Sequence, residues 1–109
     1  MAIVSTIQRG SKQFQGAFSE LWCVSSTGID FANAATGSGT FASLDVTVAG
    51  VALGDVFLGV SLGVDTVDAV IGGAVTAANT VTLTLLNNSA GAIDLASTTA
   101  KFMVGRPVW

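Results

Sequence analysis

The chain has 109 residues, of which 50% are hydrophobic and only 10% are charged, with a net charge of −3. An average soluble domain carries about 25% charged residues, so contacts between subunits are expected to cover part of this surface. All four basic residues lie in the first twelve or last nine positions, which argues against nucleic-acid binding. The longest uncharged run, 69–93, alternates with a period of two, so no membrane-spanning helix is expected.

Residues 1–40 are predicted to form an N-terminal arm and a connector to the rest of the domain. Residues 1–8 alternate weakly, which indicates a short strand or an arm. The next apolar residues have the spacing of one helical face: Phe14, Phe18, Leu21 and Trp22. Gly16 disfavours a helix, and 21–25 fits a strand equally well, so both structures stay open for 11–24. Residues 26–40 are rich in small residues and are predicted to form a loop.

Residues 41–104 are predicted to form a β module, because short apolar stretches are separated by turn residues. Strands are expected over the following ranges: 41–49, 56–62, 68–75, 80–86 and 98–104. Within 80–86, Val81, Leu83 and Leu85 alternate with threonines, which predicts one buried face.

Three details of this module follow from its glycines and apolar runs. The stretch 56–62 is almost uniformly apolar and is expected to be covered on both faces. The pair Gly72-Gly73 indicates a bulge, a bend or a close backbone approach. Residues 87–91 predict a chain reversal, after which 92–95 is expected to begin a returning strand.

Residues 105–109 are predicted to form a C-terminal tail, because Pro107 lacks the N–H that a central strand needs. The final residue, Trp109, is expected to be an anchor. The sequence therefore predicts a mainly β protein, an antiparallel β-sandwich or barrel-like module with an N-terminal arm.

The sequence shows no recognisable catalytic apparatus. It contains no His and no Tyr, and none of its serines lies in a nucleophile elbow. Cys23 is expected to be a small buried hydrophobic residue. Asp65 and Asp68 lack the additional oxygen ligands that a calcium loop supplies at fixed offsets. We therefore expect no enzyme activity and no catalytic, cofactor-binding or metal-binding residues.

Aromatic and basic residues gather near the two ends of the chain. Aromatic residues and arginine are enriched among interface anchors, whereas acidic residues are depleted there. The candidate interface residues are Arg9, Lys12, Phe14, Phe18, Trp22, Arg106 and Trp109. Two hypotheses stay open: these side chains dock on a partner, or they complete the core of their own chain.

The segment from Leu53 onward resembles small virion proteins of tailed bacteriophages. The resemblance is carried by the turn Leu53-Gly54-Asp55, by residues 75–83, by Asn87 and Gly91, and by Ala92-Ile93-Asp94. It differs in having Leu83-Thr84 where an arginine often follows the alternating run, and in lacking prolines between the strands. The resemblance implies a non-enzymatic decoration (cement) protein that stabilises a phage capsid.

This resemblance also implies partners and a location. The partners are further copies of the chain, with a trimer natural at a quasi-threefold position, and the major capsid protein or another virion shell protein. No cofactor, nucleic-acid or membrane partner is expected. The location would be the capsid surface, after synthesis in the host cytoplasm, which the single Cys23 and the lack of an export signal favour. The alternatives are a tail- or fibre-associated phage structural protein and a small carbohydrate-binding β module.

Overall fold

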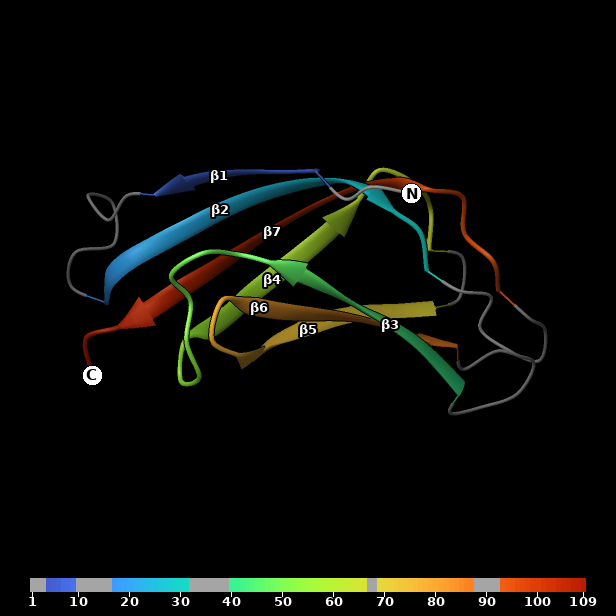
Figure 1. Cartoon of the computed structure of the whole chain (residues 1–109). Helices are drawn as coiled ribbons and strands as arrows, with labels where there is room; N and C mark the ends of the chain where they lie inside the picture. The colour runs from blue at the N-terminus through green and yellow to red at the C-terminus, as the bar shows by residue number, and fades with distance from the viewer. Residues whose placement is uncertain (1–3, 10–16, 32–39, 67–68, 88–92) are drawn as a thin grey trace.

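Two antiparallel sheets make up the computed structural model, which describes residues 4–9, 17–31, 40–66, 69–87 and 93–109 (Figure 1). Within these ranges there are seven strands and no helix: β1 (Val4–Arg9), β2 (Phe18–Ile29), β3 (Thr40–Thr47), β4 (Val56–Leu62), β5 (Ala69–Ala77), β6 (Thr80–Asn87) and β7 (Thr98–Pro107). None of the described elements is a helix that could cross a membrane. The prediction of a mainly β fold, compatible with a β-sandwich, is confirmed.

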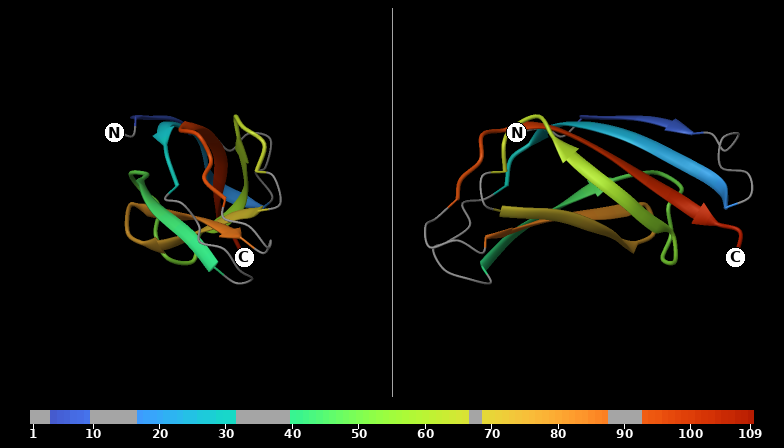
Figure 2. Two further views of the ribbon diagram at one scale, coloured as in Figure 1. Left: turned by 90° about the vertical axis from the view of Figure 1, so that its right-hand side faces the viewer. Right: turned by 180° about the vertical axis from the view of Figure 1, so that it is seen from behind.

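The large sheet has the strand order β1-β2-β7-β4, and the small sheet has the order β3-β6-β5. Figure 2 shows them as two layers, with β4 starting at the level of the small sheet and running up beside the other strands of the large sheet. In β6, Val81, Leu83 and Leu85 are fully buried, as the alternation predicted. They belong to one core with Trp22 and Val24 of β2 and with Phe102 and Val104 of β7.

The N-terminal residues 4–9 and 18–29 form strands of the large sheet, whereas the sequence predicted an arm and a connector. β2 is a strand that pairs with β7 from Phe18 to Ile29 and with β1 on its other edge. The strand alternative therefore holds for the described part of 11–24, while 11–16 lie outside the described residues. Because β1 and β2 belong to the large sheet, residues 4–9 and 18–29 are not a separate arm.

Three further expectations are corrected. β7 is a central strand that continues to Pro107, which pairs with Phe18 at the last position of the ladder, where a missing N–H costs least. β4 is only half-buried, and on one face: Phe57, Val60 and Leu62 pack against the core, while Leu58 is exposed because no described element covers the outer face of the large sheet. Residues 93–97 form no returning strand; Ile93 and Leu95 are buried in irregular backbone at the edge of the core, and β7 begins at Thr98.

Gly73 is a point of close backbone approach between the sheets. A Cβ atom there would lie 2.8 Å from Cζ of Phe57 and 3.0 Å from the backbone oxygen of Thr82. The Phe57 ring has little freedom to move, since it stacks on Phe102 with 5.8 Å between ring centroids. At the neighbouring Gly72, which lies on the outer face, a Cβ atom would meet nothing within 4 Å.

We therefore expect Gly73→Ala to lower the free energy of unfolding by about 1–3 kcal/mol through overpacking. Gly72→Ala is the matched control, and its effect should be within about 0.5 kcal/mol of zero or slightly stabilising. Urea unfolding followed by circular dichroism measures both. Equal losses for the two variants would contradict this account of the core.

Candidate functional site

The fold brings several of the candidate interface residues to one end of the sandwich, the end that carries the C-terminus (Figure 1). Arg9 pairs with Trp22 across β1 and β2, and Phe18 pairs with Pro107 across β2 and β7, close to Arg106 and Trp109. Lys12 and Phe14 lie outside the described residues. The β3–β4 loop (48–55) and the β5–β6 turn (78–79) reach the same end.

Arg106 makes a bidentate ion pair at this end. Its Nε donates to Oδ1 of Asp55 at 3.0 Å, and its Nη2 donates to Oδ2 at 2.9 Å. The Asp55 side chain is only 4% exposed, and Oδ2 also accepts the backbone N–H of Ala52 at 2.9 Å. Two parallel charge-assisted hydrogen bonds fix both position and orientation. The hydrogen bond to Asp55 raises the pKa of Arg106 above its ordinary value, so the guanidinium stays charged.

Arg106 also connects the large sheet to the β3–β4 loop. Its Nη2 donates to the carbonyl oxygen of Gly50 at 2.9 Å, and its Nη1 lies 3.8 Å from a carboxylate oxygen of Glu20. The guanidinium carbon lies 5.2 Å from the ring centroid of Trp22, a cation–π distance. A residue that was assigned to a docking tail is thus engaged mainly within its own chain.

Trp22 is fully buried, and its Nε1 donates to the carbonyl oxygen of Ala49 at 3.2 Å. For this residue the structure therefore corrects the docking hypothesis in favour of the chain's own core. The physical reason is size: a small sandwich gains most from burying its largest apolar side chain.

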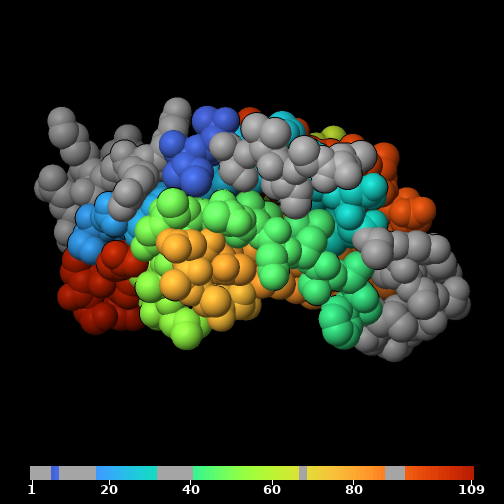
Figure 3. Space-filling view, viewed as in Figure 1, coloured from blue at the N-terminus to red at the C-terminus, as the bar shows by residue number. Residues whose placement is uncertain are grey.

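Asn79 holds the β3–β4 loop to the β5–β6 turn. It adopts a left-handed backbone conformation with φ of 62°, which Asn tolerates better than most residues. Its side-chain oxygen accepts the N–H of Gly50 at 2.8 Å, and its backbone exchanges hydrogen bonds with Val48 and Val51. Loop and turn are in contact on the molecular surface (Figure 3). We call Trp22, Gly50, Asp55, Asn79 and Arg106 together the Arg106 bracket.

Three exposed apolar residues, Leu53, Val108 and Trp109, lie at the same end; we call them the apical patch. Leu53 is at the tip of a turn closed by the hydrogen bond from Asp55 N–H to the Ala52 carbonyl. The backbone N–H of Val108 donates to the carbonyl of Ala17 at 3.0 Å, which holds the chain immediately before Trp109. Trp109 itself is 81% exposed. Phe18 is half-buried, with its ring against the backbone of Gly105.

Sequence reasoning found Trp109 and missed Leu53 and Val108. A signal for Leu53 was present: it precedes Gly54, whose φ of 98° suits a turn tip, and a turn tip points a side chain into solvent. Val108 carried no comparable signal. Its exposure follows from the end of the β7 ladder at Pro107.

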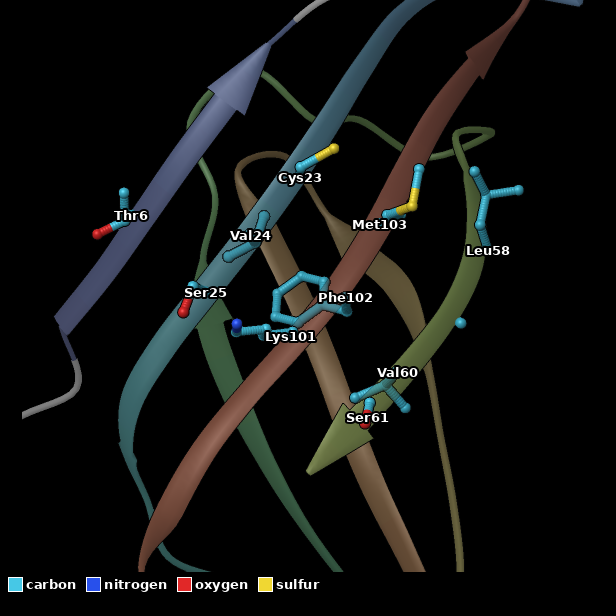
Figure 4. Close-up of a pocket in the computed structure, with 11 residues that line it drawn as sticks. Thr6, Cys23, Val24, Ser25, Leu58, Val60, Ser61, Lys101, Phe102 and Met103 are labelled. Carbon is cyan, nitrogen blue, oxygen red and sulfur yellow. The ribbon is translucent and has the colours of Figure 1, made fainter. Parts of the chain in front are cut away.

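A shallow groove of about 600 Å³ crosses the outer face of the large sheet (Figure 4). Its lining includes Thr6, Cys23, Ser25, Leu58, Lys101 and Met103. Cys23 is half-buried here beside Met103, its partner in register, rather than in the core as expected. In the part of the chain that is described, no group of three or more His, Cys, Asp or Glu side chains could hold a metal ion; Asp68 lies outside that part.

Comparison with known proteins identifies no relative of this chain. The chain matches no protein-family model, no curated protein and no solved structure.

Proposed function

We propose that this protein is a non-enzymatic virion structural protein that binds and stabilises a phage capsid as a decoration, or cement, protein. The single observation that carries the proposal is an exposed aromatic side chain on a rigid support: Trp109 is 81% exposed and follows a strand end fixed by the Arg106 bracket. The resemblance from Leu53 onward supports the virion as the setting. The partners are further copies of the chain and the major capsid protein or another shell protein.

The apical patch suits protein contact more than sugar binding. Tryptophan is among the residues that dominate interface energetics, and a fully buried ring removes roughly 150–250 Å² from water. The other two residues of the patch, Leu53 and Val108, are apolar, and Arg106 and Asp55 at this end already bond each other. A carbohydrate platform instead needs polar groups beside the aromatic ring that can bond hydroxyls. A tail or fibre position would use the same patch, so location on the particle distinguishes the two virion roles.

Binding alone accounts for stabilisation of a shell. A ligand that binds the assembled state and not the dissociated state stabilises it by mass action, without any reaction. A rigid patch strengthens this effect, because little conformational entropy is lost when the patch docks. The Arg106 bracket provides that rigidity by hydrogen bonds to the β3–β4 loop, which carries Leu53.

We expect Trp109→Ala to weaken binding to capsids by about 10- to 100-fold, the range of a hot-spot residue. Its thermal unfolding should be unchanged, because the side chain is exposed. Co-sedimentation with capsids assembled without this protein measures the binding. Leu58→Ala is the matched control, since it truncates an exposed apolar side chain on the outer face of the large sheet.

Imaging of intact particles then tests the setting. The proposal requires density for the chain at regular positions on the capsid, and particles without it should release DNA at a lower temperature. Density confined to the tail would replace the capsid role with the tail-associated one. Purified particles that contain no copy of the chain would refute both.

A further inference from the structure

The outer face of the small sheet carries a row of exposed apolar side chains across all three strands. Phe41 of β3 is in register with Leu86 of β6, which is in register with Val70 of β5. These side chains are 65%, 37% and 61% exposed. We call this row the ridge. Exposed apolar side chains in contact across strands form a continuous patch, in contrast to singly scattered ones.

The next two rows of the same face carry only small side chains and one acid. They are Ser43–Thr84–Gly72 and Asp45–Thr82–Ala74. A hollow of about 370 Å³ lies over β5 and β6 beside the ridge and is floored by Gly72 and Ala74. At Gly72 a Cβ atom would find open space. The ridge and the hollow are therefore adjacent on one surface.

Among the described side chains of these three rows the only charge is on Asp45, which lies on β3 at the edge of the sheet. The Asp45 carboxylate accepts the Thr82 hydroxyl at 2.7 Å, and Thr82 lies 2.8 Å from the hydroxyl of Thr76. The remaining described side chains of the three rows are uncharged. Such a face has little electrostatic pattern with which to select an unlike partner.

We propose that the outer face of the small sheet pairs with the same face of a second copy. The two-fold axis runs across the strands, between the ridge and the hollow. Rotation about this axis places the ridge of each copy over the hollow of the other, so that every contact occurs twice. Isologous interfaces require this property, a patch that carries both a projection and its complement. This face would be the surface through which copies of the chain associate. The pairing itself does not depend on the proposed capsid function; only its role on the shell rests on that function.

The area of the face sets the strength of the pairing. Three strands of about eight residues, spaced about 4.8 Å apart with a rise of about 3.4 Å per residue, cover roughly 400 Å² per copy. Stable complexes bury roughly 800 Å² per partner. The pairing should therefore be weak in dilute solution. It should strengthen when the apical patch holds neighbouring copies on a shell, because tethering raises their effective concentration.

Thiol cross-linking in the full-length chain tests the geometry. Thr84→Cys in a Cys23→Ser background places a thiol near the axis, and a short bis-maleimide should link two copies into a covalent dimer at high micromolar protein. Ser61→Cys in the same background is the matched control on the outer face of the large sheet and should give at least tenfold less dimer. Adding Phe41→Asp to Thr84→Cys introduces a charge at an exposed ridge position and should reduce the dimer at least fivefold.

The outcomes separate this inference from the proposed function. Equal cross-linking at positions 84 and 61, or cross-linking at 84 that is insensitive to Phe41→Asp, would overturn the pairing. Capsid binding without any cross-link at position 84 would also overturn the pairing and leave the capsid role standing. A specific cross-link at position 84 in a protein that binds no capsid would support the pairing and refute the capsid role.

Discussion

Replacing Trp22 with alanine should lower the free energy of unfolding by about 3–5 kcal/mol, the range for a large buried aromatic side chain. Small domains have a free energy of unfolding of about 5–15 kcal/mol, so this single change would remove a large part of it. Three contributions disappear together: the buried ring, its hydrogen bond to the Ala49 carbonyl, and its contact with the Arg106 guanidinium. Urea unfolding followed by circular dichroism measures the change.

Two variants show whether burial is the cause. Trp22→Phe retains an aromatic ring and removes the indole N–H, so it should cost about 1–3 kcal/mol through the lost hydrogen bond to the Ala49 carbonyl and the lost volume. Trp109→Ala removes the same kind of side chain from an 81% exposed position, and its effect should stay within about 0.5 kcal/mol. Similar losses for Trp22→Ala and Trp109→Ala would mean that Trp22 is not a core residue.

The strands with one polar face were predictable from the sequence. In β6, valine and leucine alternate with threonine, and the structure buries Val81, Leu83 and Leu85 as expected. The boundaries of β3, β5 and β6 differ from the predicted ones by no more than two residues, because turn residues flank these strands. A period of two identifies a strand when one side is packed and the other meets water.

β2 was not predictable by the same reasoning, because both of its faces carry apolar residues. Trp22 and Val24 point into the core, while Leu21 and Cys23 lie on the alternate face, and Leu21 is also buried. This removes the alternation and leaves Phe14, Phe18, Leu21 and Trp22 with an accidental helical spacing. β2 is a strand because it pairs with β7, which lies about eighty residues away in the sequence. Pairing over such a distance leaves no local sequence signal.

The contacts of the Arg106 bracket could likewise not be predicted from local sequence patterns. Asp55 and Arg106 are 51 residues apart, and the sequence placed them in a turn and a tail. The antiparallel register of β4 and β7 pairs Val56 with Gly105, so the residues just outside that pair, Asp55 and Arg106, become neighbours. The sequence identified Arg106 as a candidate interface residue, but it did not predict its partner. In the structure Arg106 binds Asp55 of its own chain.

Arg106→Ala is expected to lower the free energy of unfolding by about 2–3 kcal/mol. Among the described residues, the Asp55 carboxylate, 4% exposed, then keeps the N–H of Ala52 as its hydrogen-bond donor, and a buried charge without a counter-ion is costly. The loss stays below the roughly 3–5 kcal/mol of a fully buried pair, because the Arg106 side chain is 37% exposed. Binding through the apical patch should weaken as well, since the β3–β4 loop loses its three hydrogen bonds from Arg106, two at Asp55 and one at Gly50.

Two further variants and a change of pH test the mechanism by which Arg106 acts. Arg106→Lys keeps the charge but cannot make the bidentate contact, so it should recover only part of the loss. Lys101→Ala removes an exposed cation of the same strand and should change stability by less than about 0.5 kcal/mol. Hydrogen bonding to Asp55 raises the pKa of Arg106 above its unfolded-state value, so its contribution is fully present below the unfolded-state pKa and is lost only as the pH rises through the higher folded-state value. The difference between wild type and Arg106→Ala should therefore be the same at about pH 7 and about pH 9. A difference that shrinks across this interval would mean that another titrating group, rather than the Arg106 guanidinium, holds the β3–β4 loop in place.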